Sequence, residues 1–386
     1  MTSATSSSEA VQRRRIDAGT LLTDRIEALR ERLKLAQALV GGAPGFVAAI
    51  AAKAKDVDEL AGAPAGEFAW PTLAAREDGL KGLFREVLAL LQGENRPAFP
   101  DASAVVLARS LVAELAGKFP VGAAPAVVPD VDDSFSDFVE LIRLRFPAVG
   151  VWDVPVVAHE FGHFVAYRLT SWEDGLQRSQ AVRTFITNYL GLRNIKHENE
   201  QKRWRQWLNE FFADAFATYC MGPCYVSSAL LLRFEVSQAH KESTTHPSAA
   251  ARAAAILETL SEMNRDLSCM YRVAIRALES QWSGLEKFAE PDAERICPIE
   301  DAKEVARQLY PVLSNIARSA RYETWDNADA LQYVLTKPDK RPEGPLSARD
   351  LLNAAWLARS RGCDAATVSA RTLELWQSRA AGVKRG

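Results

Sequence analysis

The chain has 386 residues, of which 48% are hydrophobic and 25% are charged, and its formal net charge is −2. A chain of this length and composition can bury a large core, and it predicts roughly two or three domains. The near-neutral charge argues against nucleic acid as a partner, and the basic aromatic cluster 202–207 is interpreted as a solvated helix face. The longest uncharged stretch, Leu35–Ala52, is broken by glycine and proline, so no membrane span is predicted.

Residues 1–18 are rich in serine and threonine and include a short basic run, and they are predicted to be a disordered tail. No apolar segment of the secretory type follows them. The five cysteines, an odd number at irregular spacing, argue against a disulfide framework and predict free thiols. Together these features predict a cytoplasmic protein.

Residues 19–128 are predicted to form an N-terminal helical region. Apolar residues recur there at helical spacing before Gly41 and again before Gly93. The proline-rich stretch 119–133 indicates a boundary, after which residues 129–260 are predicted to form the catalytic core.

Segments with strand character are short, chiefly 126–128 and 148–151. Ala148–Trp152 is the candidate for an edge strand that would pair with an extended substrate. The predicted fold class is therefore mainly α, a zincin-like core with at most a small β element and helical regions on both flanks.

The run His159-Glu160-Phe161-Gly162-His163 carries the strongest functional signal. On a helix, positions i and i+4 lie on one face about 40° apart, so both imidazoles can bind one zinc ion. Glu160 would then project toward the open coordination position as a general base. The helix itself is plausible, because Asp153 can cap it and Pro155 suits its first turn.

The spacing after His163 excludes two arrangements of the third protein ligand. Ala166 and Leu169 stand where the extended pattern has a glycine and a third histidine. Thermolysin-like spacing requires a glutamate about twenty residues on, where the chain has Ala181 to Arg183.

Glu210 and Asp214 are the better candidates, in a helix predicted over residues 200–220. One carboxylate can bind zinc directly, while the other, one turn on, accepts the outer ring N–H of a ligand histidine. Acidic residues in so apolar a segment are costly unless they are paired or bind metal. Weaker candidates for the third ligand lie in polar stretches: Glu173, His197, Glu198 and Glu200.

His246 precedes Pro247, which can begin the next helix, so its imidazole would be presented from a turn. A histidine there could hydrogen-bond a developing oxyanion, and Arg252 could brace the turn. The alternative is a solvent-exposed loop histidine with no role in catalysis. If His246 faces away from the metal, the next candidates are Tyr219, Tyr225 and His240.

The three segments HEFGH, NEFFAD and HPSAAAR together resemble the gluzincin metallopeptidases of the M48 type, which pair HExxH with ExxxD and a later HPxxxxR. The resemblance covers about residues 150–255. It implies a zinc site and places its functional groups: His159, His163 and Glu210 bind zinc, Glu160 is the general base, Asp214 orients a ligand histidine, and His246 lies near the substrate carbonyl. Many members of that family are integral membrane proteins, whereas this chain has no predicted span.

Residues 261–386 are predicted to form a C-terminal helical region. Helices are expected from residue 253 onward, with a polar break at 337–345: 253–263, 267–288, 302–317 and 348–361.

The function predicted from the sequence is a zinc-dependent endopeptidase that cleaves peptide bonds through a metal-activated water, with Glu160 as general base. Its partner would be a protein or peptide substrate, and the helical flanks could recruit a regulatory protein. Two alternatives remain open: a metal-binding interaction protein without proteolytic activity, and a zinc amidohydrolase of a small molecule.

Overall fold

The structure is a computed structural model that describes residues 18–39, 44–61, 69–93, 103–119, 124–130, 134–136, 141–145, 151–169, 176–290, 296–337, 339–342, 344 and 346–383. The predicted tail, residues 1–18, lies outside these ranges except for its last residue, which begins the first helix. Within the described ranges the fold is mainly helical with one three-stranded sheet, as the sequence predicts. None of the described helices has the length and apolar character needed to cross a membrane.

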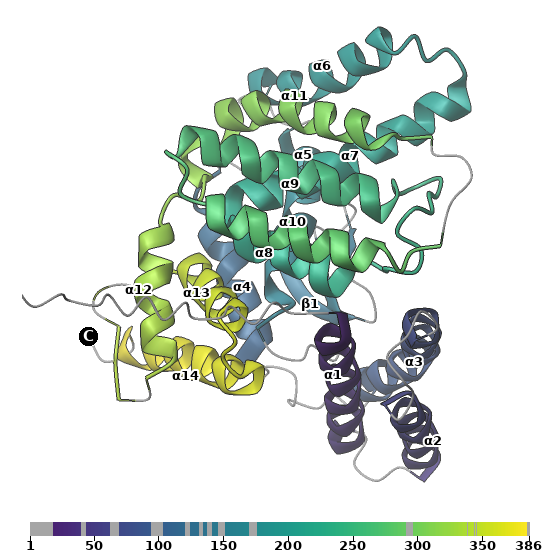
Figure 1. Cartoon of the computed structure of the whole chain (residues 1–386), viewed down its shortest axis with the longest axis vertical. Helices are drawn as coiled ribbons and strands as arrows, with labels where there is room; N and C mark the ends of the chain where they lie inside the picture. Colours follow the sequence, from purple (N-terminus) through teal and green to yellow (C-terminus); the bar gives the residue numbers. More distant parts are fainter. Residues whose placement is uncertain are drawn as a thin grey trace, which may run out of the picture.

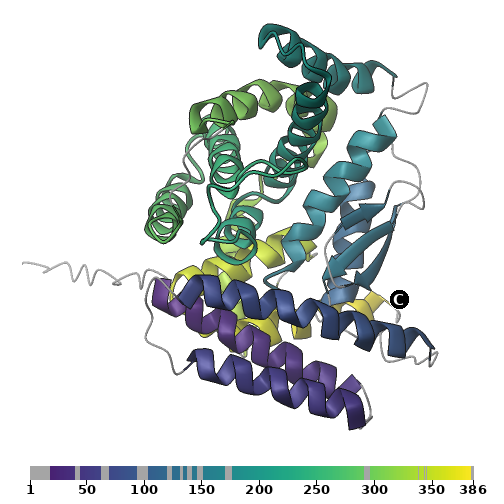
Figure 2. The ribbon, with the colours of Figure 1, turned by 90° about the vertical axis from the view of Figure 1, so that its right-hand side faces the viewer.

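The first three helices, α1 (Ala18–Leu39), α2 (Pro44–Ala61) and α3 (Ala69–Gly93), pack against one another. They form a layer along one side of the molecule, at the bottom of Figure 2. An ion pair between Arg25 and Glu77, with 2.8 Å between nitrogen and oxygen, links α1 to α3.

Helix α4 (Ser103–Ala116) packs against a small sheet of three strands: β1 (Ala126–Asp130), β2 (Ser134–Ser136) and β3 (Leu141–Arg145). β3 lies at the centre, parallel to β1 and antiparallel to β2. The side chains of Ile142 and Leu144 on β3 are buried, as the alternating pattern of that strand requires.

The edge strand predicted at Ala148–Trp152 is wrong where the structure describes it. Val151 and Trp152 lie in a turn, and residues 146–150 fall outside the described ranges. The carbonyl oxygen of Trp152 accepts a hydrogen bond from the Ser228 hydroxyl at 2.7 Å, so this backbone group serves a contact with a helix. The strand at the sheet edge beside the motif helix is β2 instead, where the Phe135 ring meets Phe164 edge-on.

The motif segments lie in a stack of helices in the upper half of Figure 1. Its members are α5 (Val157–Leu169), α6 (Leu176–Leu192), α7 (Glu198–Met221), α9 (Ala249–Asp266), α10 (Arg272–Glu286) and α11 (Ile299–Ala317). Helix α7 contacts α5, α9 and α11. Every residue from Glu210 to Met221 is buried, which identifies α7 as the central helix of the core.

Three short segments complete the core: a 3₁₀ turn η1 (Val154–Val156), helix α8 (Pro223–Ser228) and a π-helical turn η2 (Ala229–Arg233). Helices α12 (Trp325–Leu335), α13 (Ala348–Ser360) and α14 (Ala365–Val383) form a second group, in which α13 contacts both α4 and α8. The 3₁₀ turn η3 (Arg318–Ala320) follows α11.

The helix predicted over residues 267–288 begins later, at Arg272. Ser268 and Cys269 have positive φ angles, which interrupt the helical path after α9. All five cysteines are free thiols, as predicted.

Candidate metal centre

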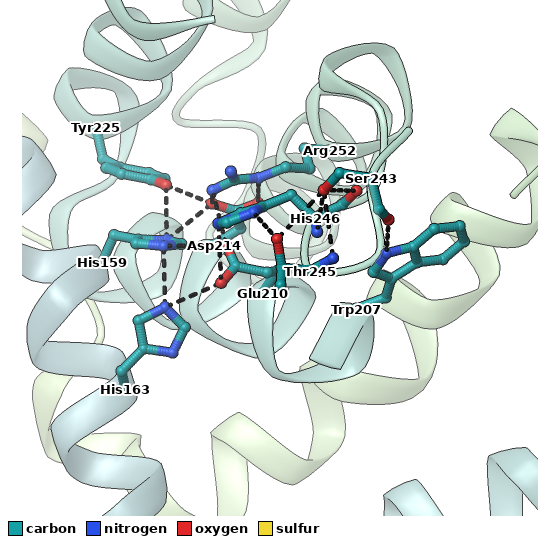
Figure 3. Close-up of polar contacts among 10 residues, drawn as sticks. All are labelled: His159, His163, Trp207, Glu210, Asp214, Tyr225, Ser243, Thr245, His246 and Arg252. Atoms are coloured by element: carbon teal, nitrogen blue, oxygen red, sulfur yellow. Dashed lines mark hydrogen bonds and ion pairs between the residues drawn. The ribbon is translucent and has the colours of Figure 1, made fainter. Parts of the chain in front are cut away.

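The helices that carry the two main motifs, α5 and α7, approach closely at Gly162. A Cβ atom at this position would lie 3.0 Å from the Cα of Ala213 and 3.2 Å from the ring of Phe216. Glycine therefore allows an approach that any other residue would obstruct. Because Gly162 directly precedes His163, this contact sets the histidines of α5 against the carboxylates of α7 (Figure 3).

The three predicted zinc ligands come together between these helices. Nε2 of His159 lies 3.2 Å from Nε2 of His163. The two carboxylate oxygens of Glu210 face these nitrogens: Oε2 lies 3.4 Å from Nε2 of His159, and Oε1 lies 3.4 Å from Nε2 of His163. All three ligand atoms lie within 4.8 Å of one another. Atoms bound at about 2.0–2.1 Å to a tetrahedral ion are about 3.3 Å apart, so these separations match the edges of such a tetrahedron.

The chemistry of the group fits a cation. The Oε2 atom of Glu210 is buried and makes no hydrogen bond with any described residue. It lies 3.4 Å from Nε2 of His159 and 3.5 Å from Nη2 of Arg252, both beyond good hydrogen-bonding distance. A buried carboxylate oxygen without a hydrogen bond lowers the stability of the folded protein. Two imidazoles and one carboxylate are a common set of metal ligands, so the group can hold a metal ion.

Asp214 lies behind His159, on the side away from His163. Its Oδ1 atom is 3.0 Å from Nδ1 of His159, which leaves Nε2 of the same ring to face the other ligands. Asp214 is completely buried, and burial alone would raise the pKa of its carboxyl group. The guanidinium of Arg252 outweighs burial and holds this pKa well below its usual range. The carboxylate is therefore ionised and accepts the outer ring proton of His159.

The electrostatic field at His159 favours positive charge. Burial lowers the pKa of His159, but Asp214 and then Glu210 outweigh it and raise the pKa to about 10. This shift shows how strongly the two carboxylates stabilise a cation at this position.

Arg252 lies behind the metal ligands together with Asp214, as expected, but it does not brace the turn that carries His246. Its Nε and Nη2 atoms donate to the two carboxylate oxygens of Asp214 at 2.7 and 2.8 Å. The buried carboxylate of Asp214 attracts the guanidinium more strongly than turn carbonyls do. The turn is closed by Ser243 instead, whose hydroxyl accepts from the backbone N–H of His246 at 2.8 Å.

His246 faces the metal site from the rim. Its Nε2 atom is 3.6 Å from Oε1 of Glu210, and its Nδ1 atom is 2.8 Å from the hydroxyl of Thr245. The side chain is 55% exposed, whereas Asp214 is fully buried. Burial lowers the pKa of His246, although Glu210 opposes the shift, so the imidazole is neutral near pH 7.

Glu160 is buried on α5 directly after His159, so the sequence places it next to the first ligand.

The helix cap predicted at Asp153 is absent: the side chain of Asp153 makes no capping hydrogen bond. The carboxylate of Asp153 instead lies 3.3 Å from Nε of Arg233 and 4.0 Å from Nη2 of Arg32. Pro155 occupies the first turn, as predicted.

The weaker candidates do not join the group in the described part of the chain. His197, Glu198 and Glu200 lie at the start of α7, roughly three turns before Glu210. Glu173 falls outside the described residues.

The position of Tyr225 differs from the one considered from the sequence, which names it as an alternative to His246 for donating to the oxyanion. Its hydroxyl donates to Oδ1 of Asp214 at 2.6 Å, behind His159. The other two alternatives are engaged elsewhere: the Tyr219 ring packs against Tyr310, and Nδ1 of His240 lies 3.7 Å from Glu286. No local pattern in the sequence indicates the contact between Tyr225 and Asp214, because this contact depends on how α8 folds back onto α7.

Comparison with known proteins gives no relative: no protein-family model, curated protein or solved structure matches this chain.

Proposed function

We propose that this protein is a zinc-dependent endopeptidase of the gluzincin kind. The observation that carries the proposal is the convergence of His159, His163 and Glu210, whose ligand atoms lie at the spacing of a tetrahedral zinc site. Asp214 supports the assignment, because it holds the outer nitrogen of a ligand histidine as in many zinc enzymes.

A zinc ion bound by these residues would act as a Lewis acid that polarises a carbonyl group and lowers the pKa of water. Glu160 would accept the proton of the attacking water and pass it to the leaving amine. His246 would donate a hydrogen bond to the carbonyl oxygen of the substrate as negative charge develops there. Asp214 would keep the ring of His159 in one tautomer throughout.

The exposure of the ligands favours a catalytic site over a purely structural one. His159 and Asp214 are almost completely buried, whereas the side chain of His163 is 21% exposed. His246, at the rim on the same side, is more exposed still. A structural zinc site is closed by four protein ligands, whereas a catalytic site keeps one position open to water or substrate.

The proposal is tested by zinc analysis combined with degradation of an unfolded protein. Wild type should bind one zinc ion per chain and degrade the unfolded substrate. Glu160→Gln should retain the zinc and lose activity by about 10²- to 10⁴-fold. Glu198→Gln, which changes an exposed acid on α7, is the matched control and should behave like wild type.

Two outcomes would replace the proposal. Zinc binding without degradation of any protein or peptide by wild type would favour a metal-binding interaction protein. Hydrolysis of small amides alone would favour a zinc amidohydrolase. Equal turnover by Glu160→Gln and wild type would remove Glu160 from its role as general base.

Two broader proposals accompany this function. The free thiols fit a reducing compartment, and we place the protein in the cytoplasm on that basis. The helical groups α1–α3 and α12–α14 lie below the helices that carry the metal centre in Figure 1, and we propose that they offer surfaces for a regulatory protein.

A further inference from the structure

Tyr225 reaches the metal centre because the chain reverses sharply after α7. Helix α7 ends at Gly222, which has a φ angle of +62°. A Cβ atom at this position would also lie 2.7 Å from the ring of Tyr322. Both the backbone conformation and the close ring require glycine here. Helix α8 starts directly afterwards, so Tyr225 returns to Asp214, which lies eleven residues earlier in the chain.

Helix α8 is fixed at both ends by hydrogen bonds to distant segments. The side chain of Asn353 on α13 accepts from the backbone N–H of Cys224 at 3.0 Å and donates to the carbonyl of Met221 at 2.8 Å. At the other end, the Ser228 hydroxyl donates to the carbonyl of Trp152, just before the motif helix. The position of Tyr225 is therefore set by the C-terminal helices and by the segment that leads into α5.

The Tyr225 side chain is buried and lies flat beside His159. The two rings are nearly parallel, with 9° between their planes and 6.5 Å between their centroids. The tyrosine hydroxyl donates to Oδ1 of Asp214 at 2.6 Å and lies 3.4 Å from Nδ1 of His159 (Figure 3). It thus contacts the outer nitrogen of the ligand, on the side away from Glu210 and His163.

The protons of this cluster have one consistent arrangement. Asp214 is ionised by Arg252 and can only accept, so Tyr225 gives it its single hydroxyl proton. The tyrosine oxygen can then only accept from His159. Both groups near Nδ1 of His159 are therefore acceptors, so Nδ1 keeps its proton and Nε2 is the nitrogen that gives up its proton when a metal ion binds.

We infer that Tyr225 is a positioning residue of the metal centre, which holds the His159 ring in the zinc-binding tautomer through Asp214. The inference rests on the proposed function, since it concerns the same site. It assigns no catalytic contact to Tyr225, because its hydroxyl lies behind the ligand and not on the open side where substrate would enter.

The test compares the zinc affinity of two phenylalanine variants by competition with a chelator. Tyr225→Phe removes only the hydroxyl and should raise the zinc dissociation constant by roughly 10-fold, the lower end of the effect of losing such a partner. Tyr219→Phe is the matched control, because Tyr219 is equally buried but packs against Tyr310 on α11. Its zinc affinity should equal that of wild type.

The melting temperature in EDTA separates positioning from packing. If Tyr225 acts by positioning, Tyr225→Phe stays folded in EDTA but loses zinc affinity, whereas Tyr219→Phe, whose buried hydroxyl makes no hydrogen bond with a described residue, keeps both the stability and the zinc affinity of wild type. Wild-type zinc affinity in folded Tyr225→Phe would overturn the inference. If Tyr225→Phe does not fold, Tyr225→Met, which fills the same space flexibly, replaces it with the same expected loss and the same criterion.

Failure of the proposed function would look different. In that case wild type itself would bind no zinc, or would bind it without hydrolysing any substrate. The chelator competition needs no substrate, so a wild type that binds zinc without turnover still tests the role of Tyr225.

Discussion

Two clusters of buried and half-buried charged side chains join distant parts of this chain, and they differ in whether every buried polar atom has a hydrogen-bond partner. The metal-site cluster consists of His159, His163, Glu210, Asp214 and Arg252. The second, called here the Glu114–Arg349 cluster, consists of these two side chains with Ser347 and the backbone groups that they bind. It connects α4 to α13 and to the end of α7.

In the Glu114–Arg349 cluster no buried side-chain atom lacks a hydrogen-bond partner among the described residues. Nε of Arg349 donates to Glu114 at 2.8 Å, and its Nη1 donates to the carbonyls of Cys220 and Ala320. Glu114 also accepts from the hydroxyl of Ser347 and from the backbone N–H of Ala348, both at 2.9 Å. This cluster caps the start of α13 and needs nothing further, so its role is structural.

In the metal-site cluster one buried carboxylate oxygen has no hydrogen-bond partner among the described residues. Nε2 atoms of His159 and His163 face each other, and the buried Oε2 of Glu210 lacks a hydrogen bond among the described residues. The comparison teaches that burial of charge alone does not indicate function. What indicates a ligand is a buried carboxylate oxygen without a hydrogen bond at a point where the ligand atoms of three residues converge.

The largest effect is expected when the metal-site cluster loses a ligand. Glu210→Ala should weaken zinc binding by more than the roughly 10- to 100-fold that loss of an outer partner costs. Metal analysis after dialysis should find wild type with one zinc and the variant with almost none. Unchanged zinc content would remove Glu210 from the ligand set.

The Glu114–Arg349 cluster should respond in stability and not in metal content. Glu114→Ala leaves Arg349 buried without its carboxylate, which should lower the free energy of unfolding by about 3–5 kcal/mol. Urea denaturation measures the loss, and zinc per folded chain should stay at the wild-type value. A selective loss of zinc in this variant would contradict the distinction between the clusters.

At the rim of the metal site, His246→Ala should lower kcat by roughly 10²-fold and leave KM little changed. The reason is that a donor to the developing oxyanion acts mainly in the transition state. Steady-state kinetics with a peptide substrate, at full zinc occupancy, gives both constants. A change in stability without a selective loss in kcat would assign His246 to the packing of its loop.

The smallest effect concerns the close contact that brings the motif helices together. Gly162→Ala should force α5 and α7 apart, destabilise the protein by about 1–3 kcal/mol and weaken zinc binding. Gly284→Ala on α10 is the matched control, because a Cβ there meets nothing within 4 Å. The control should be neutral or stabilising by up to about 1 kcal/mol. Equal effects of both variants on zinc affinity would show that the close approach does not shape the site.

The parts of the site that were predicted from sequence are those fixed by helical spacing. His159 and His163, and likewise Glu210 and Asp214, are four residues apart, and a helix alone sets each pair on one face. That the two pairs meet was inferred from the resemblance and from the cost of burying acids, and the geometry agrees.

Other contacts could not be predicted because they depend on tertiary structure. Tyr225 reaches Asp214 only through the reversal at Gly222, and Arg252 turns to Asp214 because that carboxylate is buried beside it. The short strand β3 shows the same limit: its alternating pattern is visible in Leu141–Arg145, but five residues do not specify the partner strands on either side.

The most direct test of the metal centre is anomalous X-ray scattering from crystals of the zinc-loaded protein, with data on both sides of the zinc absorption edge. The structure predicts one strong peak bounded by Nε2 of His159, Nε2 of His163 and the carboxylate of Glu210. A zinc peak bound by other residues, or crystals grown with zinc that show no peak among these three side chains, would contradict the account.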